Sequence, residues 1–265
     1  MHPYLHISQL KIPTYGLCLA FAVVLCSFLI YRSLKKDKSI TKEAVPPEYL
    51  LVILAVCILS FVFGANLLYI LVTYNFSYLL EKIKNLDFSF TKQMGMVFYG
   101  GLISGIFGAL VAAKCTKINL LSLEKHIVPY VPLGHAIGRL GCLLGGCCYG
   151  MKYDGFCAVY YKTPIVASLS PNTGYFPVQP MESILDLCIM AILFIYAKKQ
   201  RRRGNILSLY LLLYAIMRFT TEIFRGDAAR GLFSGISTSQ WISIGLAAFF
   251  FIRIIYLKIS SKKVI

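Results

Sequence analysis

Four charged side chains and one tyrosine lie inside stretches of sequence that are otherwise apolar. Tyr214, Arg218 and Glu222 follow one another at intervals of four residues, which places them on one face of a helix. Arg139 stands among glycines, and Glu182 opens another apolar stretch. A charge inside a membrane is costly, so such residues indicate either a functional site or a pair that only neutralises itself. Because the guanidinium fork suits phosphate oxygens, we predict a site for the phosphate of a lipid headgroup.

Three cysteines lie close to Arg139 in the stretch GRLGCLLGGCCYG: Cys142, Cys147 and Cys148. Their C-x4-CC spacing differs from the paired C-x2-C spacing of structural zinc sites. On a continuous helix, Cys142 and Cys147 lie about 140° apart and share no face, unless the glycine pair at 145 and 146 interrupts the helix. We favour packed free thiols and expect no metal ion. A metal site and a disulfide to Cys157 are the alternatives.

The elements that carry these residues are predicted to be membrane-spanning helices. The chain of 265 residues is 58% hydrophobic and has a mean hydropathy of +0.70, well above soluble domains. A helix crosses a bilayer with about 20 residues, and seven stretches are long enough and nearly free of charge: 14–31, a part of 49–74, 93–113, 126–150, 180–197, 204–221 and 231–252. The sequence therefore predicts an all-α integral membrane protein with seven transmembrane helices, in which residues 1–265 form a single domain.

Basic residues give the chain a formal charge of +16 and predict its orientation. When the chain is threaded alternately across a membrane, most of its 27 Lys and Arg residues fall on one side. By the positive-inside rule that side is cytoplasmic, so the N-terminus faces out and the C-terminus faces the cytoplasm. The charge then requires no nucleic-acid partner. The aromatic-rich loop 151–179, between the fourth and fifth helices, becomes a small extracytoplasmic cap.

Six segments follow one another over nearly the full length of the chain: TYGLCLA, FYGGLISG, GHAIGRLGCLLGGCCYG, PVQPMES, YAIMRFTTEIFRGD and STSQWISI. In order and spacing they resemble segments of the bacterial prolipoprotein diacylglyceryl transferases. The second is similar to Phe-His-Gly-Gly-Leu-Ile-Gly in that family. The third is similar to its signature, Gly-Arg-x-Gly-Asn-Phe-x-Asn-x-Glu-x-x-Gly, and the fifth to Tyr-x-x-x-Arg-Phe-x-x-Glu-x-Phe-Arg.

The resemblance implies a monomeric multi-pass enzyme of the bacterial cytoplasmic membrane that needs no cofactor. Such an enzyme moves the diacylglyceryl group of phosphatidylglycerol onto the lipobox cysteine of preprolipoproteins and forms a thioether. By the resemblance, the expected catalytic residues are Arg139, Arg218, Tyr99 and Glu182. The expected lipid-binding residues are Tyr15, Gly100, Gly101, Gly138, Gly141, Tyr214, Glu222 and Arg225.

Four positions depart from the family pattern. Tyr99 stands where the family has a histidine, and Cys142, Gly145 and Cys147 replace two asparagines and the glutamate of the signature. The thiol of the acceptor cysteine must lose its proton to a base. A phenol, with a pKa of about 10, is a poorer candidate for this base than a histidine is, so a carboxylate such as Glu182 or Glu222 could take the thiol proton instead. Three other functions stay open: a related lipid transferase with a changed donor or acceptor, a lipid-binding pseudoenzyme, and an anion transporter.

Overall fold

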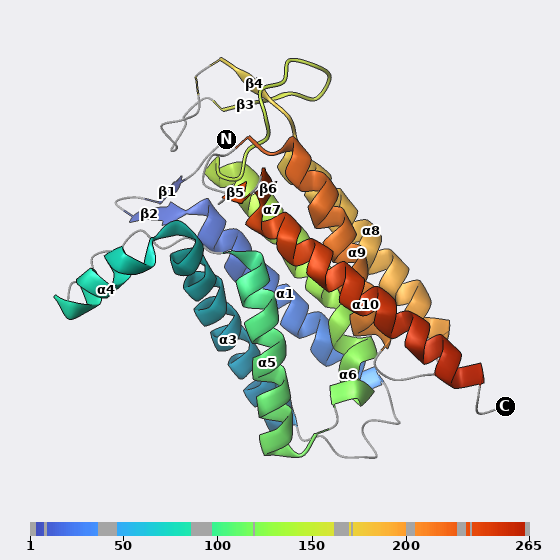
Figure 1. Ribbon diagram of the computed structural model, residues 1–265. Coiled ribbons are helices and arrows are strands. Elements are labelled where there is room, and N and C mark those ends of the chain that lie inside the picture. The colour runs from blue at the N-terminus through green and yellow to red at the C-terminus, as the bar shows by residue number, and fades with distance from the viewer. Residues whose placement is uncertain are drawn as a thin grey trace. The chain divides into compact units, whose positions relative to one another are not determined.

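The computed structural model describes residues 4–7, 10–36, 47–85, 97–118, 120–161, 170, 172–199, 205–226, 232–233 and 235–262 (Figure 1). The long helices in this part of the chain are α1 (Thr14–Lys36), α3 (Pro47–Thr73), α5 (Phe98–Thr116), α7 (Val131–Gly145), α8 (Val178–Lys199), α9 (Asn205–Thr221) and α10 (Thr238–Lys262). Shorter helices are α4 (Phe76–Lys84), α6 (Leu120–Ile127) and the 3-10 turns η2 (Val128–Tyr130) and η3 (Glu222–Phe224). Short antiparallel pairs join β1 (Tyr4–Ile7) to β2 (Leu10–Pro13), β3 (Val159–Tyr160) to β4 (Gly174–Tyr175) and β5 (Leu232–Phe233) to β6 (Ile236–Ser237).

Six helical segments are long and apolar enough to cross a membrane. They are Thr14–Lys36, Leu51–Thr73, Phe98–Thr116, Leu123–Gly145, Val178–Lys198 and Asn205–Phe224. They confirm a mostly helical protein of the membrane-spanning type and match six of the seven predicted spans. The predicted seventh span corresponds to α10, which is 25 residues long.

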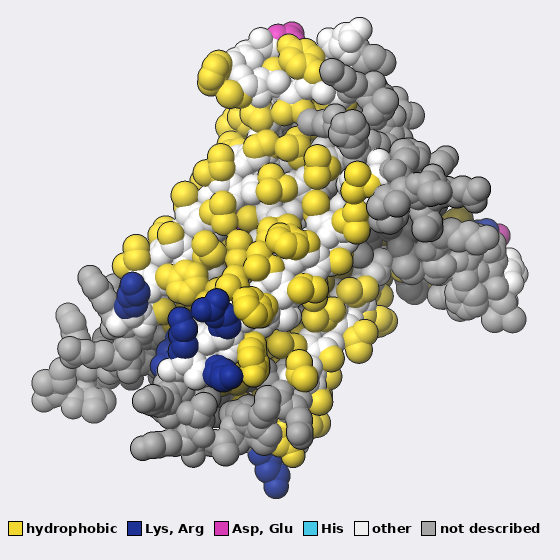
Figure 2. Space-filling view, turned by 180° about the vertical axis from the view of Figure 1, so that it is seen from behind, with side chains coloured by type: hydrophobic (Ala, Val, Ile, Leu, Met, Phe, Trp, Pro, Cys, Tyr) yellow, Lys and Arg dark blue, Asp and Glu magenta, His cyan; other side chains and the backbone are white. Residues whose placement is uncertain are grey.

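The surfaces of these helices are apolar, as a lipid environment requires. Phe21 and Phe28 on α1, Leu59 and Phe63 on α3, and Phe107 on α5 each expose more than half of their area. Hydrophobic side chains accordingly cover most of the described helical surface in the view of Figure 2. An aqueous solvent would penalise such an exterior, because burial of apolar surface is the main driving force of folding in water.

The chain divides into two compact units, which are described separately. Unit 1 comprises Met1–Lys36, Leu123–Ala228 and Gln240–Ile265, and unit 2 comprises Asp37–Ser122 and Ala229–Ser239. In unit 1, α7 packs against both α1 and α8, and α8 packs against α9. The hydroxyl of Ser183 on α8 donates to the carbonyl of Ala136 on α7 at 3.1 Å. That hydrogen bond fixes the position of α8 along the axis of α7. That the whole chain acts as one domain stays a prediction.

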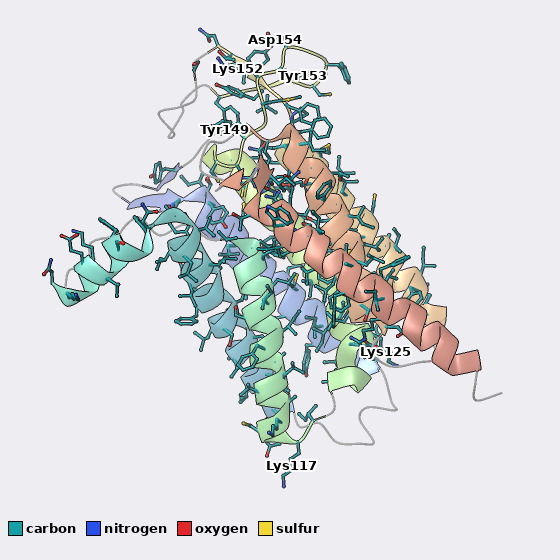
Figure 3. All side chains as sticks on the ribbon, viewed as in Figure 1. Lys117, Lys125, Tyr149, Lys152, Tyr153 and Asp154 are labelled. Carbon is teal, nitrogen blue, oxygen red and sulfur yellow. The ribbon has the colours of Figure 1, made fainter. Side chains whose placement is uncertain are left out.

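In unit 1, the segment between α7 and α8 contains two short strands. Val159 of β3 pairs with Tyr175 of β4, and the buried rings of Tyr149, Tyr161 and Tyr175 form a small core. In Figure 3, the labelled residues of this segment lie at the opposite end of unit 1 from Lys125. Residues 162–169 and 171 of the predicted cap lie outside the described residues, and its last two residues already belong to α8.

In unit 2, α3 and α5 pack closely because small residues line their contact. A Cβ added to Gly64 would collide with the side chain of Ser104, and one added to Gly100 would collide with the carbonyl of Gly64. Ser104 Oγ also donates to the carbonyl of Ser60 on α3 at 2.7 Å. This is the small-residue packing that membrane helices commonly use.

Two predicted spans have different boundaries in the structure. The span predicted at 126–150 is not one helix: η2 interrupts it, and α7 ends at Gly145 because Gly146 adopts the left-handed conformation with φ 70°. The span predicted at 231–252 begins only at Thr238, since β5 and β6 form a hairpin turn at Gly235, where φ is 76°. Residues 93–96 of the third predicted span lie outside the described residues.

Candidate active site

Glu182 joins two arginines from different helices inside unit 1. Its Oε1 accepts a hydrogen bond from Arg218 Nη1 of α9 at 2.7 Å, and its Oε2 pairs with Arg139 Nη2 of α7. The hydroxyl of Thr221 donates to Oε1 at 2.9 Å. All four side chains are buried, and Glu182 retains only 1% of its exposure. The two arginines that the sequence singled out therefore share one carboxylate.

A second carboxylate, Glu222, continues this network toward Arg225. Glu222 Oε2 lies 2.5 Å from Arg218 Nη2 and 3.8 Å from Arg225 Nη1. The predicted helical face holds for Arg218 and Glu222, which pair as residues i and i+4, although Glu222 stands in the 3-10 turn after α9. We call Arg139, Arg218, Arg225, Glu182 and Glu222 the arginine cluster.

The arginine cluster carries a surplus of positive charge, because three guanidiniums face two carboxylates. Arg139 also has a donor left over: its Nε is buried and has no hydrogen-bond partner among the described residues. A buried donor without a partner costs free energy, so it calls for a ligand or a water molecule. A surplus of positive charge and a spare donor are features that an anion-binding site requires.

A second pair, of a partly buried histidine and a buried aspartate, lies one helical turn from the cluster on α7 and α8. His135 Nδ1 is 2.8 Å from Asp186 Oδ2, and the His135 ring contacts the ring of Tyr214 at 5.3 Å between centroids. Tyr214 is thus buried beside this pair, and its role in lipid binding stays a prediction. Neither His135 nor Asp186 was among the predicted site residues. The signal was available, because each lies four residues from a predicted one, Arg139 and Glu182 respectively.

Thr221 and Gln179 were also not predicted, since uncharged polar residues give no comparable signal in an apolar sequence. Gln179 is completely buried. Its Nε2 donates to the carbonyl of Cys147 at 2.9 Å and to the phenol oxygen of Tyr161 at 2.8 Å. Gln179 thereby ties the start of α8 to the chain that leaves α7.

The glycines of α7 differ in what surrounds them. A Cβ on Gly141 would lie 3.0 Å from Cys18 Cβ and 3.2 Å from Tyr15 Cδ2. Gly141 therefore lets α1 approach α7 and brings Tyr15 next to the helix that carries Arg139. A Cβ on Gly138 would have no described atom within 4 Å, so a side chain at this position would meet open space. Lipid binding by Tyr15, Gly138 and Gly141 stays a prediction.

The predicted residues of α5 belong to unit 2. Tyr99 is buried, and the added Cβ atoms at Gly100 and Gly101 would collide with α3, at Leu68 and Phe61 among others. These glycines serve the packing of α5 against α3. Their participation in lipid binding and the catalytic role of Tyr99 stay predictions.

The three cysteines after Arg139 come together because α7 ends in a Schellman motif. The N–H of Cys147 donates to the carbonyl of Cys142 at 3.1 Å, and the N–H of Gly146 donates to that of Leu143 at 3.4 Å, the bonding pattern that defines this helix end. The Sγ atoms of Cys142, Cys147 and Cys148 all lie within 4.8 Å of one another. The helix is thus interrupted at the glycine pair. The separation of about 140° between Cys142 and Cys147, expected on a continuous helix, therefore does not apply.

The thiols beyond the end of α7 influence one another. Hydrogen bonds with Cys142 and Cys148 raise the pKa of the Cys147 thiol, whereas hydrogen bonds with Cys142 and Cys147 hold the pKa of Cys148 well below its usual value. Arg139 Nη1 also donates to Cys142 Sγ at 3.8 Å. All nine cysteines are free thiols in the structure, and Cys157, the alternative disulfide partner, is exposed.

Comparison with known proteins identifies the family. The family profile of prolipoprotein diacylglyceryl transferases matches residues 3–256. The chain belongs to this family. Relatives named phosphatidylglycerol–prolipoprotein diacylglyceryl transferase include one from Clostridium tetani, 31% identical over 89% of each chain, and one from Dehalococcoides mccartyi, 32% identical over 93% of this chain and 90% of the relative. One from Clostridium perfringens, whose name adds the number 2, is 31% identical over 90% of this chain and 88% of the relative.

Family membership makes the chain a transferase and agrees with the resemblance that the six sequence segments suggested. It also gives the arginine cluster a context, since the relatives are named for a phospholipid, and a phospholipid carries an anionic phosphate.

Proposed function

We propose that this protein transfers the diacylglyceryl group of phosphatidylglycerol to the lipobox cysteine thiol of preprolipoproteins. The names of its relatives support the two substrates. The observation in the structure that supports the proposal best is the shared position of Arg139 and Arg218 on Glu182. It leaves a cationic surplus at one buried point, where a lipid phosphate can be held.

In the proposed reaction, the thiolate sulfur attacks the C3 carbon of the diacylglyceryl group. The bond between this carbon and the phosphate oxygen breaks, and glycerol phosphate leaves with the electron pair. Arg139 and Arg218 stabilise the charge that develops on the phosphate, in a site where little water competes for it. The donor at Arg139 Nε, which has no acceptor among the described residues, supplies a further hydrogen bond.

We assign Glu182 a positioning role in this reaction. Both of its oxygens are occupied, Oε1 by Arg218 and Thr221 and Oε2 by Arg139. A carboxylate held in this way is poorly placed to take the proton of an incoming thiol. Its contribution is to fix the separation of the two guanidiniums.

We also propose a membrane topology of seven spans, with α10 as the seventh. The basic residues at the last turns of α1 and α5, which include Lys36 and Lys114, support a cytoplasmic location for these helix ends. The N-terminus and the segment between α7 and α8 then lie outside the bacterial cytoplasmic membrane. We propose that the protein acts there as a monomer and without a nucleic-acid partner.

The proposed function is tested in cells depleted of their own diacylglyceryl transferase. Wild-type protein should restore the added diacylglyceryl mass on a reporter lipoprotein, as followed by mass spectrometry. Arg139→Ala should not restore it, whereas Arg32→Ala, which changes an exposed arginine on α1, should behave as the wild type. If well-expressed wild-type protein restores nothing, the proposed reaction is wrong, and a pseudoenzyme or a changed donor or acceptor becomes the better interpretation.

A further inference from the structure

The cluster of three thiols at the end of α7 plays no part in the reaction described above. Its geometry comes from the backbone: the Schellman motif brings Cys147 back to Cys142, since its two ends, C3 and C″, are the positions that commonly touch in this motif. Cys148 follows with φ 54°, a left-handed conformation that residues other than glycine rarely adopt without a local reason. All three Sγ atoms converge as a result.

The separation of the thiols suits a metal ion. With a metal–sulfur bond of about 2.3 Å, two thiolates on a tetrahedral ion lie roughly 3.8 Å apart. Thiols that already lie within 4.8 Å of one another therefore need only a small adjustment to bind one ion. A disulfide would use two of the three sulfurs and would leave the third without a function.

The surroundings compensate the charge that thiolates bring. Arg139 Nη1 donates to Cys142 Sγ at 3.8 Å, which supplies positive charge directly beside one ligand. Gln179 holds the carbonyl of Cys147 at 2.9 Å and so fixes the backbone between two ligands. Partners of this kind orient metal ligands and tune the affinity of the site.

We propose that Cys142, Cys147 and Cys148 bind one thiophilic metal ion of the Zn²⁺ type, and that its fourth coordination position takes the thiol of the acceptor cysteine. Sites with three protein ligands commonly keep such an open position for substrate. The second half of the proposal rests on the proposed function, because it assumes that the acceptor is a thiol.

Metal binding removes the need for a protein base. A thiol that coordinates Zn²⁺ loses its proton, which passes to water, and the metal keeps its oxidation state. The bound sulfur then forms its bond to the glyceryl carbon while the carbon–oxygen bond to phosphate breaks and glycerol phosphate leaves. Arg139 lies next to both the metal ligands and the expected phosphate position, so one residue connects the two halves of the reaction.

Metal binding is tested on purified full-length protein without any activity measurement. The protein is stripped of metal under reducing conditions and titrated with Co²⁺, whose sulfur-to-metal charge-transfer absorption reports thiolate ligands. We expect about one ion per chain, and we expect each of the variants Cys142→Ser, Cys147→Ser and Cys148→Ser to weaken binding about tenfold or more. Cys188→Ser, an exposed cysteine of α8, is the matched control and should bind as the wild type.

Thermal unfolding shows whether each serine variant is folded. Absence of thiolate absorption in the wild type, or equal binding by a folded Cys147→Ser variant, would overturn the proposal. A Cys142–Cys147 disulfide in protein purified without reductant, detected by peptide mass spectrometry, would overturn it in favour of a redox pair.

The open position is tested with a synthetic peptide that contains one cysteine. Added to the Co²⁺-loaded protein without any lipid, it should change the charge-transfer absorption, and the same peptide with serine should not. If peptide and metal bind but phosphatidylglycerol gives no transfer, the proposed function fails while the metal site stands. If metal-free protein transfers at the wild-type rate, the role of the metal is refuted while the proposed function stands.

Discussion

Glu182 is the residue on which the arginine cluster depends most. It faces guanidiniums of two helices and receives the hydroxyl of Thr221, all in a buried environment. A buried pair is not by itself a source of stability, but removing one partner leaves an uncompensated charge. Since Glu182 serves two arginines at once, its loss affects both Arg139 and Arg218.

The variant Glu182→Gln keeps the volume of the side chain and removes its charge. We expect the free energy of unfolding in detergent to fall by about 3–5 kcal/mol. Transfer activity should fall about a hundredfold, because the two guanidiniums are no longer held in place. Denaturant titration and a transfer assay measure the two effects. Glu81→Gln, an exposed residue of α4, should change neither, and unchanged stability in Glu182→Gln would show that the buried pairs do not hold the site.

Tyr161 gives a pH-dependent prediction outside the membrane-spanning segments. Burial raises its pKa from 10.0 to about 12, so the folded state favours the neutral phenol, which accepts the hydrogen bond of Gln179. The stabilisation of the folded state by this neutral phenol is complete below pH 10 and is lost as pH rises through about 12. In a pH titration followed by ultraviolet absorbance, the wild type should therefore show one phenol that ionises above pH 10 and that is absent from Tyr161→Phe. A stability difference between the two proteins that did not change over this pH range would contradict the assignment.

The site residues that sequence identified were those whose charge is out of place in an apolar segment. Arg139, Arg218, Glu182 and Glu222 all satisfy that criterion, and the structure brings them together. The meeting of Cys142 and Cys147 depends instead on one left-handed glycine, Gly146. Residue spacing alone showed that the two cysteines could meet only if the helix was interrupted at the glycine pair. It could not predict whether the helix was interrupted there.

At the scale of elements, the contact between α3 and α5 shows how small residues set a helix separation. Along α5, added Cβ atoms at Gly100 and Gly108 would collide with α3, at Gly64 and Ser60 respectively, whereas one at Gly105 would make ordinary contacts at 3.7 Å. The two helices can therefore tolerate a methyl group at some positions of the interface and not at others.

Gly64→Ala should weaken this pair of helices, because its Cβ would meet both the side chain of Ser104 and the carbonyl of Gly100 at 2.6 Å. We expect a loss of about 1–3 kcal/mol in unfolding free energy, as for other overpacked contacts. Gly105→Ala introduces the same methyl group into ordinary contact distance and is the matched control. Thermal unfolding in detergent measures both variants. Equal midpoints would show that α3 and α5 are not held at this separation.

The existence of the helices was predictable and their ends were less so. Stretches without charge predicted six segments that the structure shows to be long and apolar enough to span a membrane. Their ends depend on local backbone conformation, such as the left-handed Gly146 after α7 and the turn at Gly235 before α10. Hydropathy cannot predict such conformations. It measures how apolar a segment is, and a glycine fits an apolar segment whether its backbone is helical or left-handed.

At the scale of the whole molecule, the proposed orientation places the two ends of the fourth span on opposite sides of the membrane. Cys115 precedes the span Leu123–Gly145 and Cys157 follows it, and both cysteines are exposed. Lys114 and Lys117 lie beside Cys115 and predict a cytoplasmic location for it. Cys157 belongs to the segment between α7 and α8, which the same rule places outside.

A membrane-impermeant maleimide tests this orientation in intact cells, with peptide mass spectrometry to identify the labelled cysteine. Cys157 should react, and Cys115 should react only after the membrane is broken. Labelling in detergent controls for reactivity, because both thiols should then be modified. The reverse pattern would show that the protein has the opposite orientation. Labelling of both cysteines in intact cells would show that the span between them does not cross the membrane. The reverse pattern would move the segment that follows the thiol cluster away from the side on which the acceptor cysteine is expected, whereas labelling of both cysteines would leave this segment outside and place the end of α5 there as well.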